Sequence, residues 1–286
     1  MIGDAALPLG ESGLSRLLMW SLSLRQQARI KDAARHNEPV RSVRDLPELW
    51  QLLQGSTAQV DLVIVSATAA DANVLDVIRR IVRERPRAAI VAYCTPGAQQ
   101  AASLRALAAA GVHQFLLEGS DDSPVALRAV LQDARRQCAA DWVLNEMSEC
   151  FSPAVHPLLE TALTAPAEVT SVMDLANALG VHRKTLFNRC RRAGVPVPAE
   201  LLVWTRLMLV AYFLDATACT VETIANEMGY PSATALRNTL KRYTGRTAQE
   251  LRRDGAVRAI IQRLRVGAAT RAPGDLTLAP DVTVLT

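Results

Sequence analysis

Two segments of this chain carry side chains suited to contact with nucleic acid. In residues 182–193, the outward face of an expected helix carries Arg183, Lys184, Phe187, Asn188 and Arg191. In residues 232–243, the outward face of a second expected helix carries Thr234, Arg237, Asn238 and Lys241. Basic side chains pair with phosphates, while amide and guanidinium groups also hydrogen-bond to base edges. These residue types therefore indicate two surfaces that could hold DNA.

The two segments belong to copies of one pattern, residues 175–194 and 224–245. The first copy has its landmarks at Leu175, Gly180, Leu186 and Asn188, and the second has them at Ile224, Gly229, Leu236 and Asn238. The offset between the copies is 49 before the glycine turn and 50 after it, so the second copy has one extra turn residue. Agreement at this density is hard to obtain by chance. Each copy is typical of a helix-turn-helix.

Helix start and stop signals define the helices of both copies. The first copy predicts helices over 172–179 and 182–193, and the second predicts helices over 221–228 and 232–243. His182 and Ser232 stand at N-cap positions, and Gly194 and Gly245 follow the last turns. Between the copies, Pro198 begins an apolar helix of about 17 residues, which would span roughly 25 Å and separate the two units by a fixed distance.

Composition bounds the class of protein. The chain has 286 residues, of which 50% are hydrophobic and 21% charged, so it can form two domains with cores. No apolar run is long enough to span a membrane, and the first residues lack a secretory signal, which together favour a cytoplasmic protein. The five cysteines have no CxxC spacing and the four histidines are scattered, so no metal site is expected. No nucleophile-base motif or glycine-rich phosphate loop occurs, so neither enzyme activity nor a cofactor is predicted.

Charge is concentrated in the half of the chain that contains the repeat. Residues 166–265 hold 15 basic and 8 acidic residues, a net charge of +7. The whole chain has a net charge of +4, so the remainder sums to −3. A local excess of positive charge is the electrostatic property that phosphate binding requires. It also fits a solvated basic face without a partner, so charge alone does not decide between the two.

The N-terminal half alternates strands and helices. Strands are predicted at 17–20, 39–43, 61–66, 89–93 and 115–117. Helices are predicted at 24–36, 46–53, 72–85, 98–110 and from Pro124 to about 149. Five strands that alternate with five helices indicate a parallel sheet covered on both faces.

This order resembles the receiver domain of two-component response regulators over residues 14–140. The resemblance implies a pair of acids after the first strand, a phospho-accepting Asp after the third, a Thr or Ser after the fourth and a Lys after the fifth. The corresponding residues here are Trp20, Ser21 and Leu22, then Ser66, Thr95 and Glu118. Only the hydroxyl of Thr95 and the aromatic Phe115 agree with the receiver pattern.

The missing acids indicate a pseudo-receiver that cannot accept a phosphoryl group on Asp. Without clustered carboxylates the site has nothing to hold a divalent cation, and the neutral hydroxyl of Ser66 does not replace the acceptor carboxylate. Glu118 also places a negative charge where the phosphoryl group needs a positive one. An unrelated interaction domain with a flavodoxin-like fold is the alternative interpretation.

The C-terminal half resembles the DNA-binding domain of AraC/XylS-type regulators over residues 168–253. The resemblance is carried by the LA-x-x-LG-V turn, the Thr185-Leu186 step and the run GYPSATALRNTLKRYTG. It implies double-stranded DNA as partner, with two recognition helices in successive major-groove segments about 34 Å apart. The implied base-facing residues are Lys184, Phe187, Asn188, Thr234, Arg237 and Asn238. The implied phosphate-facing residues are Arg183, Arg191, Arg206, Ser232, Lys241 and Arg242.

Asn188 and Asn238 depart from the family pattern, because members commonly carry arginine there. Arginine reads guanine, whereas asparagine pairs with the N6 and N7 atoms of adenine. Adenine contacts are therefore predicted at both positions, and Arg237 could still read a guanine. A phosphate or solvent contact by the asparagines is the alternative.

The predicted fold is an α/β receiver-like domain with a doubly wound, five-stranded parallel sheet, followed by an all-α domain with two helix-turn-helix units. The predicted parts are a tail at 1–13, the receiver-like domain at 14–150, a linker at 151–167, the DNA-binding domain at 168–265 and a disordered tail at 266–286. The hypothesis is a transcription regulator that dimerises through its receiver-like domain and could contact RNA polymerase. The alternative is a signalling adaptor that has lost DNA binding.

Overall fold

The computed structural model describes residues 16–34, 39–54, 60–67, 72–95, 100–148, 151–166, 168–216 and 219–269. The chain forms two compact units. The first extends to Cys138, and the second contains the chain from Ala139 onward except Ala216–Ala218. The division falls inside one long helix, α5 (Pro124–Ser148), so residues of this helix contribute to both units.

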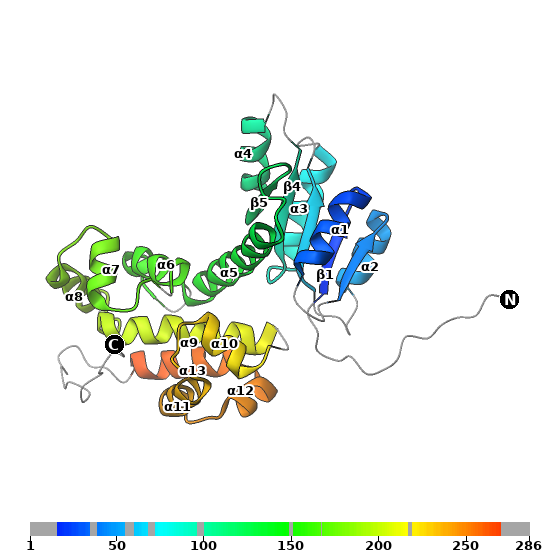
Figure 1. The fold of residues 1–286 in the computed structure, drawn as a ribbon. Coiled ribbons are helices and arrows are strands. Elements are labelled where there is room, and N and C mark those ends of the chain that lie inside the picture. Colours follow the sequence, from blue (N-terminus) through cyan, green and yellow to red (C-terminus); the bar gives the residue numbers. More distant parts are fainter. Residues whose placement is uncertain are drawn as a thin grey trace. The chain divides into compact units, whose positions relative to one another are not determined.

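The first unit contains a parallel sheet of five strands (Figure 1). The strands are β1 (Arg16–Trp20), β2 (Val40–Val43), β3 (Val60–Ser66), β4 (Ala89–Cys94) and β5 (Gln114–Leu117). Their order is β2-β1-β3-β4-β5, and Val63 pairs with Leu18 on one side and Ile90 on the other. This is the strand order of flavodoxin-like folds, to which receiver domains belong. The predicted sheet is confirmed.

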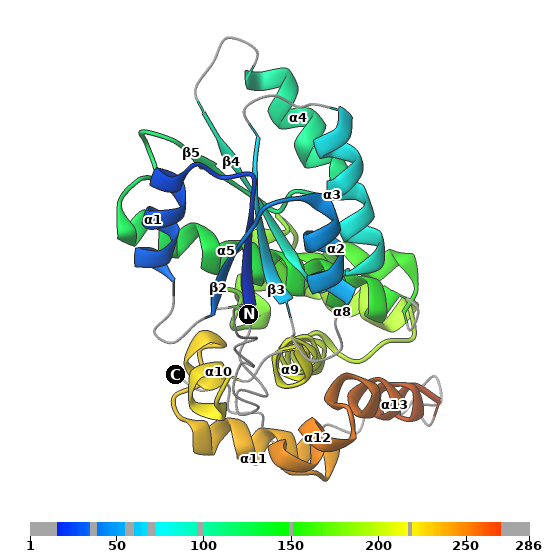
Figure 2. The same cartoon turned by 90° about the vertical axis from the view of Figure 1, so that its right-hand side faces the viewer.

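Helices cover both faces of the sheet. They are α1 (Leu24–Ala33), α2 (Leu46–Gln54), α3 (Ala72–Glu84), α4 (Gln100–Ala110) and α5. Figure 2 shows α1 and α5 on one face and α2 and α3 on the other. Leu62 and Ile64 pack toward the α1 and α5 side, while Val63 and Val65 pack on the opposite side. Burial on both faces explains why β3 is a continuous apolar run, as in other parallel sheets.

A buried ion pair connects β3 to α5. The Arg135 Nε donates to the Asp61 Oδ2 at 3.0 Å, and the two side chains are only 7% and 8% exposed. Asp61 lies at the start of the strand, where the sequence shows an acid directly before a buried apolar run. Because buried charges require a partner, this contact fixes α5 against the sheet.

His113 makes the stability of the sheet unit dependent on pH. The Ile90 N–H donates to the His113 Nδ1 at 3.0 Å, and burial lowers the pKa of His113 from 6.5 to about 4. The unfolded chain therefore takes up a proton at a higher pH than the folded chain does. The stabilisation is complete above pH 6.5 and is lost as the pH falls toward 4.

We expect the free energy of unfolding of this unit to fall by about 2 kcal/mol between pH 7 and pH 5 through His113. In His113→Asn, the amide oxygen can accept the Ile90 N–H but does not titrate in this range. Urea denaturation at both pH values should show a smaller pH dependence in this variant. An unchanged dependence would mean that other groups cause it.

The second unit is helical. After η1 (Pro153–Val155), its helices are α6 (His156–Thr164), α7 (Val172–Ala178), α8 (Arg183–Arg192), α9 (Pro198–Ala216), α10 (Val221–Glu227), α11 (Ala233–Thr244), α12 (Ala248–Asp254) and α13 (Ala256–Ala269). Every residue from Leu207 to Leu214 on α9 is buried, so this helix forms the core. None of the helices in the described ranges is long and apolar enough to cross a membrane.

Residues before, within and after the predicted linker pack into the helical unit. The Trp142 ring of α5 lies 5.5 Å from the Tyr212 ring of α9, measured between centroids. Leu158 and Leu159 of α6 are fully buried. The helix α6, inside the predicted linker, thus contributes buried side chains to the second unit.

The C-terminal helices α12 and α13 are absent from the elements predicted by sequence. The carboxylate of Asp215, at the end of α9, accepts the N–H groups of Ala256 and Val257 at 2.7 and 3.0 Å and so caps α13. α13 continues to Ala269, past residue 266, where the sequence predicts the start of a disordered tail. Residues 270–286 lie outside the described part.

Candidate nucleic-acid interface

The first helix-turn-helix is made by α7 and α8. Ser171 and Asp174 form a capping box at the start of α7, and their hydrogen bonds lower the pKa of Asp174. After α7, Gly180 takes a positive φ of 61°, which turns the chain toward α8. The His182 side chain accepts the Lys184 N–H and caps α8, as its sequence position predicts. This histidine therefore has a structural role in the turn.

The second helix-turn-helix, made by α10 and α11, repeats this construction. Thr220 caps α10, Gly229 has a φ of 70°, and Ser232 caps α11 through the Ala235 N–H. The inward residues correspond between the units and are all buried: Leu175, Ala176, Leu186 and Cys190 in the first, and Ile224, Ala225, Leu236 and Leu240 in the second.

The extra residue of the second unit is Pro231. In the first turn the Val181 N–H donates to the Ala176 carbonyl at 3.0 Å, and in the second the Tyr230 N–H donates to the Ala225 carbonyl at 2.9 Å. The next residue in the first unit is the cap of α8, whereas Pro231 precedes the cap in the second. The change of offset from 49 to 50 therefore occurs between the residue that donates the turn hydrogen bond and the N-cap of the following helix.

The outward face of α8 carries Lys184, Phe187, Asn188 and Arg191 at spacings of three, four and seven residues. Lys184 and Arg191 are exposed, while Phe187 and Asn188 are half-buried. The Arg191 Nη2 donates to the Asn188 Oδ1 at 3.1 Å. The Arg183 guanidinium lies 5.7 Å from the centroid of the Phe187 ring. The face thus combines cations, an amide and an aromatic ring.

The outward face of α11 carries Thr234, Arg237, Asn238 and Lys241 at the same spacings, and all four are exposed. The Arg237 Nη2 lies 2.6 Å from the Oε1 of Glu222 on α10. The structure therefore brings all six residues predicted to face bases onto two equivalent helix faces.

A hydrogen bond orients the Asn188 amide, whereas the Asn238 side chain is exposed. Because guanidinium groups only donate hydrogen bonds, the contact with Arg191 requires the Asn188 oxygen to face that side chain and turns the NH₂ group away. Adenine recognition needs the amide oxygen as acceptor for N6.

We expect Asn238→Ala to remove an adenine preference of about 5-fold, within the range for a lost base contact. Asn188→Ala should change adenine preference by less than about 2-fold. Competition binding to duplexes with single base-pair changes measures both effects. A large loss of adenine preference in Asn188→Ala would contradict the expected difference.

The residues predicted to contact phosphates divide into two groups. Arg183, Arg191, Lys241 and Arg242 are exposed, and Ser232 is an exposed N-cap. Arg206 is different, because its Nη2 donates to the carbonyls of Pro166 and Val169 at 3.2 and 3.3 Å. It secures the segment before α7 onto α9, so Arg206 has a role within the fold, and its contact with phosphate stays a prediction.

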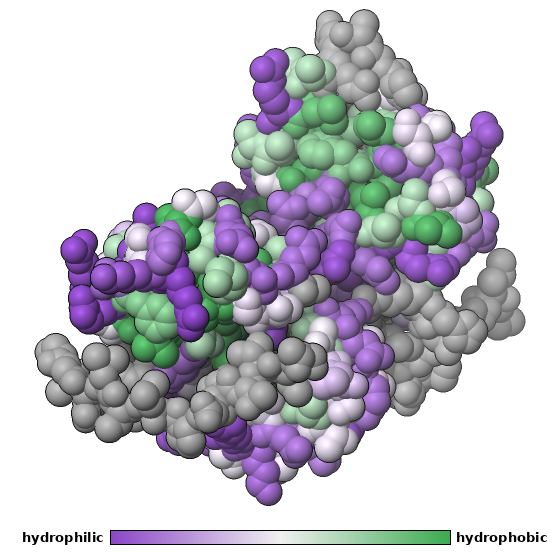
Figure 3. Space-filling view, turned by 60° about the vertical axis from the view of Figure 1, so that its left-hand side comes forward, coloured by the Kyte–Doolittle hydropathy of each residue, from purple (hydrophilic) through white to green (hydrophobic). Residues whose placement is uncertain are grey.

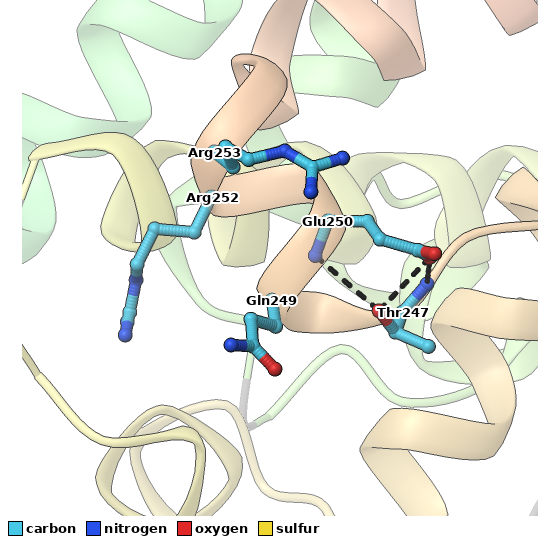
Figure 4. Close-up of a pocket in the computed structure, with 5 residues that line it drawn as sticks. All are labelled: Thr247, Gln249, Glu250, Arg252 and Arg253. Carbon is cyan, nitrogen blue, oxygen red and sulfur yellow. Dashed lines mark hydrogen bonds between the residues drawn. The ribbon is translucent and has the colours of Figure 1, made fainter.

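The surface of the helical unit in Figure 3 is largely hydrophilic, with smaller apolar areas between the polar side chains. A depression of about 530 Å³ lies over α12 and is lined by Thr247, Gln249, Glu250, Arg252 and Arg253 (Figure 4). Thr247 and Glu250 are joined as a capping box, and Arg252 donates to the carbonyls of Leu214 and Cys219. Thr247 and Glu250 thus serve the start of α12, and Arg252 holds the backbone at Leu214 and Cys219.

At the sheet edge where a receiver carries its acids, this protein has Trp20, Ser21, Leu22 and Ser66. Trp20 and Leu22 are buried, Ser21 has a positive φ of 61°, and Ser66 is half-buried at the end of β3. The Thr95 hydroxyl donates to the Glu118 carboxylate at 3.2 Å. Within the described ranges no group of three His, Cys, Asp or Glu side chains could hold a metal ion.

A polar network that the sequence did not indicate lies beside this edge. Arg29 on α1 forms an ion pair with Asp122 at 2.6 Å and lies 3.9 Å from Glu118. The Tyr93 hydroxyl donates to Asp122 at 2.9 Å, and burial raises the pKa of Tyr93. Arg29 thus supplies the positive charge next to Glu118. No local motif marks it, because its partners are 64 or more residues away in the chain.

The geometry of the second unit defines a helix-turn-helix protein. Residues 175–254 match the family described as a helix-turn-helix domain. A Streptomyces lividans protein described as an AraC-like transcription regulator is 35% identical over 105 residues. The match covers 35% of this chain and 34% of the relative, so it spans about a third of that protein.

Solved structures similar to this chain include response regulators. One from Thermotoga maritima is 17% identical, with a TM-score of 0.37, and the match covers 43% of this chain and 98% of that one. Full-length FixJ from B. japonicum is 12% identical, with a TM-score of 0.33, and the match covers 80% and 96% of the two chains. The first unit of this protein has the receiver-like fold, as its strand order shows.

Proposed function

We propose that this protein is a sequence-specific transcription regulator that places α8 and α11 in successive major-groove segments of double-stranded DNA. The observation that carries the proposal is the equivalence of the two outward faces, each with a cation and an asparagine at the same helical positions. Four exposed basic residues, Arg183, Arg191, Lys241 and Arg242, are available for phosphates. The AraC-like relative supports the same function.

Salt-dependent binding to DNA tests this proposal. With four phosphate contacts, the logarithm of the binding constant should fall with the logarithm of salt concentration with a slope of about −3.6. Fluorescence anisotropy with a random duplex gives this slope, and selection from random DNA gives the preferred sequence. Weak binding that does not depend on salt would favour the adaptor alternative, in which the receiver-like unit docks a partner protein.

We further propose that the receiver-like unit acts without phosphorylation, as a dimerisation or partner-sensing domain. The contacts of Glu118 with Thr95 and Arg29 occupy the edge where a receiver would bind a phosphoryl group. Ser66 provides no carboxylate for transfer. Incubation with acetyl phosphate should leave the protein unmodified by mass spectrometry, and stable incorporation at Ser66 would overturn the proposal. Sedimentation of the full chain tests dimerisation, and a pull-down tests RNA polymerase as a partner.

A further inference from the structure

We propose that Glu222 is a positioning residue that prepares Arg237 to read a guanine, and this rests on the proposed DNA-binding function. Glu222 lies in the first turn of α10, and Arg237 lies on the outward face of α11. Their charged atoms are 2.6 Å apart, across a sequence separation of 15 residues. The pair thus connects the supporting helix of the second unit to its outward face.

The contact leaves most of the guanidinium available. Arginine has five N–H donors in a fixed planar arrangement, and the Glu222 oxygen accepts from Nη2. The Arg237 side chain remains 50% exposed, so other donors face solvent. Guanine presents two acceptors, O6 and N7, in the major groove, and an arginine donates to both at once. Because Glu222 already holds one side of the guanidinium, Arg237 loses less conformational entropy when it binds a base.

Glu222 itself is held in place by the start of α10. Its hydrogen bonds with its own backbone N–H and with Arg237 lower the pKa of its carboxyl group, so it is ionised at neutral pH. A carboxylate in the first turn of a helix is also favoured by the helix dipole. It therefore provides a fixed negative charge for Arg237, and the same charge repels phosphates.

The first unit has a different pair at the equivalent positions. With the offset of 49 before the turn and 50 after it, Glu222 corresponds to Met173, and Arg237 corresponds to Phe187. Met173 is 53% exposed and carries no charge, so it cannot form an equivalent ion pair. The charged pair thus belongs to the second unit alone, and the two units differ in the chemistry they offer to bases.

The test uses the full chain and duplexes derived from its selected sequence, with each of the four base pairs at every position. Arg237→Ala should lose about 10-fold of guanine preference at one position. Glu222→Met, which copies the first unit, should lose about 5-fold at that same position while its affinity for random DNA rises. Glu222→Gln keeps an acceptor oxygen and should retain more than half of the preference. Glu168→Gln removes another exposed carboxylate of this unit and should leave base preference unchanged.

Two results would overturn the proposal: full guanine preference in Glu222→Met, or a position controlled by Arg237 at which the wild-type protein prefers another base. Circular dichroism of each variant confirms that it is folded. If the wild-type protein shows no salt-dependent DNA binding, the proposed function fails instead, and the two failures are distinguished.

Discussion

The double variant Arg191→Glu with Lys241→Glu is expected to bind DNA at least 100-fold more weakly than the wild-type protein at about 0.1 M salt. The two residues occupy equivalent, exposed positions on the outward faces of α8 and α11. Each substitution removes a phosphate contact and introduces a charge that phosphates repel. The loss of Arg191 also frees the Asn188 amide, so sequence preference should change together with affinity.

The salt dependence of binding identifies the cause of this loss. Removal of two phosphate contacts should reduce the steepness of the salt slope by about 1.8. Arg83→Glu with Arg105→Glu changes the net charge equally, at exposed residues of the sheet unit, and should retain nearly full affinity. Equal loss in both double variants would show that total charge determines binding and that the two faces do not.

Asp61→Ala is expected to destabilise the sheet unit by about 3–5 kcal/mol, the usual effect of breaking a buried ion pair. The variant leaves the Arg135 guanidinium buried without the carboxylate that lies 3.0 Å away. Loss of this charge partner should loosen α5 from β3. Urea denaturation followed by circular dichroism measures the change.

The matched control replaces the whole pair, as Asp61→Leu with Arg135→Met. Because apolar residues of similar volume often replace buried ion pairs without loss, this variant should be close to the wild-type protein in stability. If it is as unstable as Asp61→Ala, the defect comes from packing or from the other interactions of Arg135, and the ion pair is not its cause.

Periodicity and capping residues predicted most of the helices and strands. The β3 run reads as a buried strand because both of its faces are covered, and the ends of α3 and α8 differ by one residue from their predicted ends. Local signals sufficed because the caps His182 and Ser232 act on neighbouring N–H groups.

Contacts between residues far apart in the chain could not be predicted in this way. Arg206 has the same charge as a phosphate-contacting arginine, and only the fold shows that carbonyls 37 and 40 residues away engage it. The Arg29 network likewise depends on α1 meeting the end of β5. α13 is absent from the predicted helices, although Val257, Ile260 and Leu264 have helical spacing. No capping residue directly before this helix marks its start, because the cap is Asp215, about 40 residues earlier.

The position of Pro231 determines the helical phase of the second unit. Each residue of an α-helix advances the direction of its side chain by about 100°, so an insertion within α11 would rotate every later side chain away from the outward face. Pro231 instead precedes the Ser232 cap, where the turn absorbs the added length. The copies can therefore differ in length while Asn188 and Asn238 keep the same angular position on their helices.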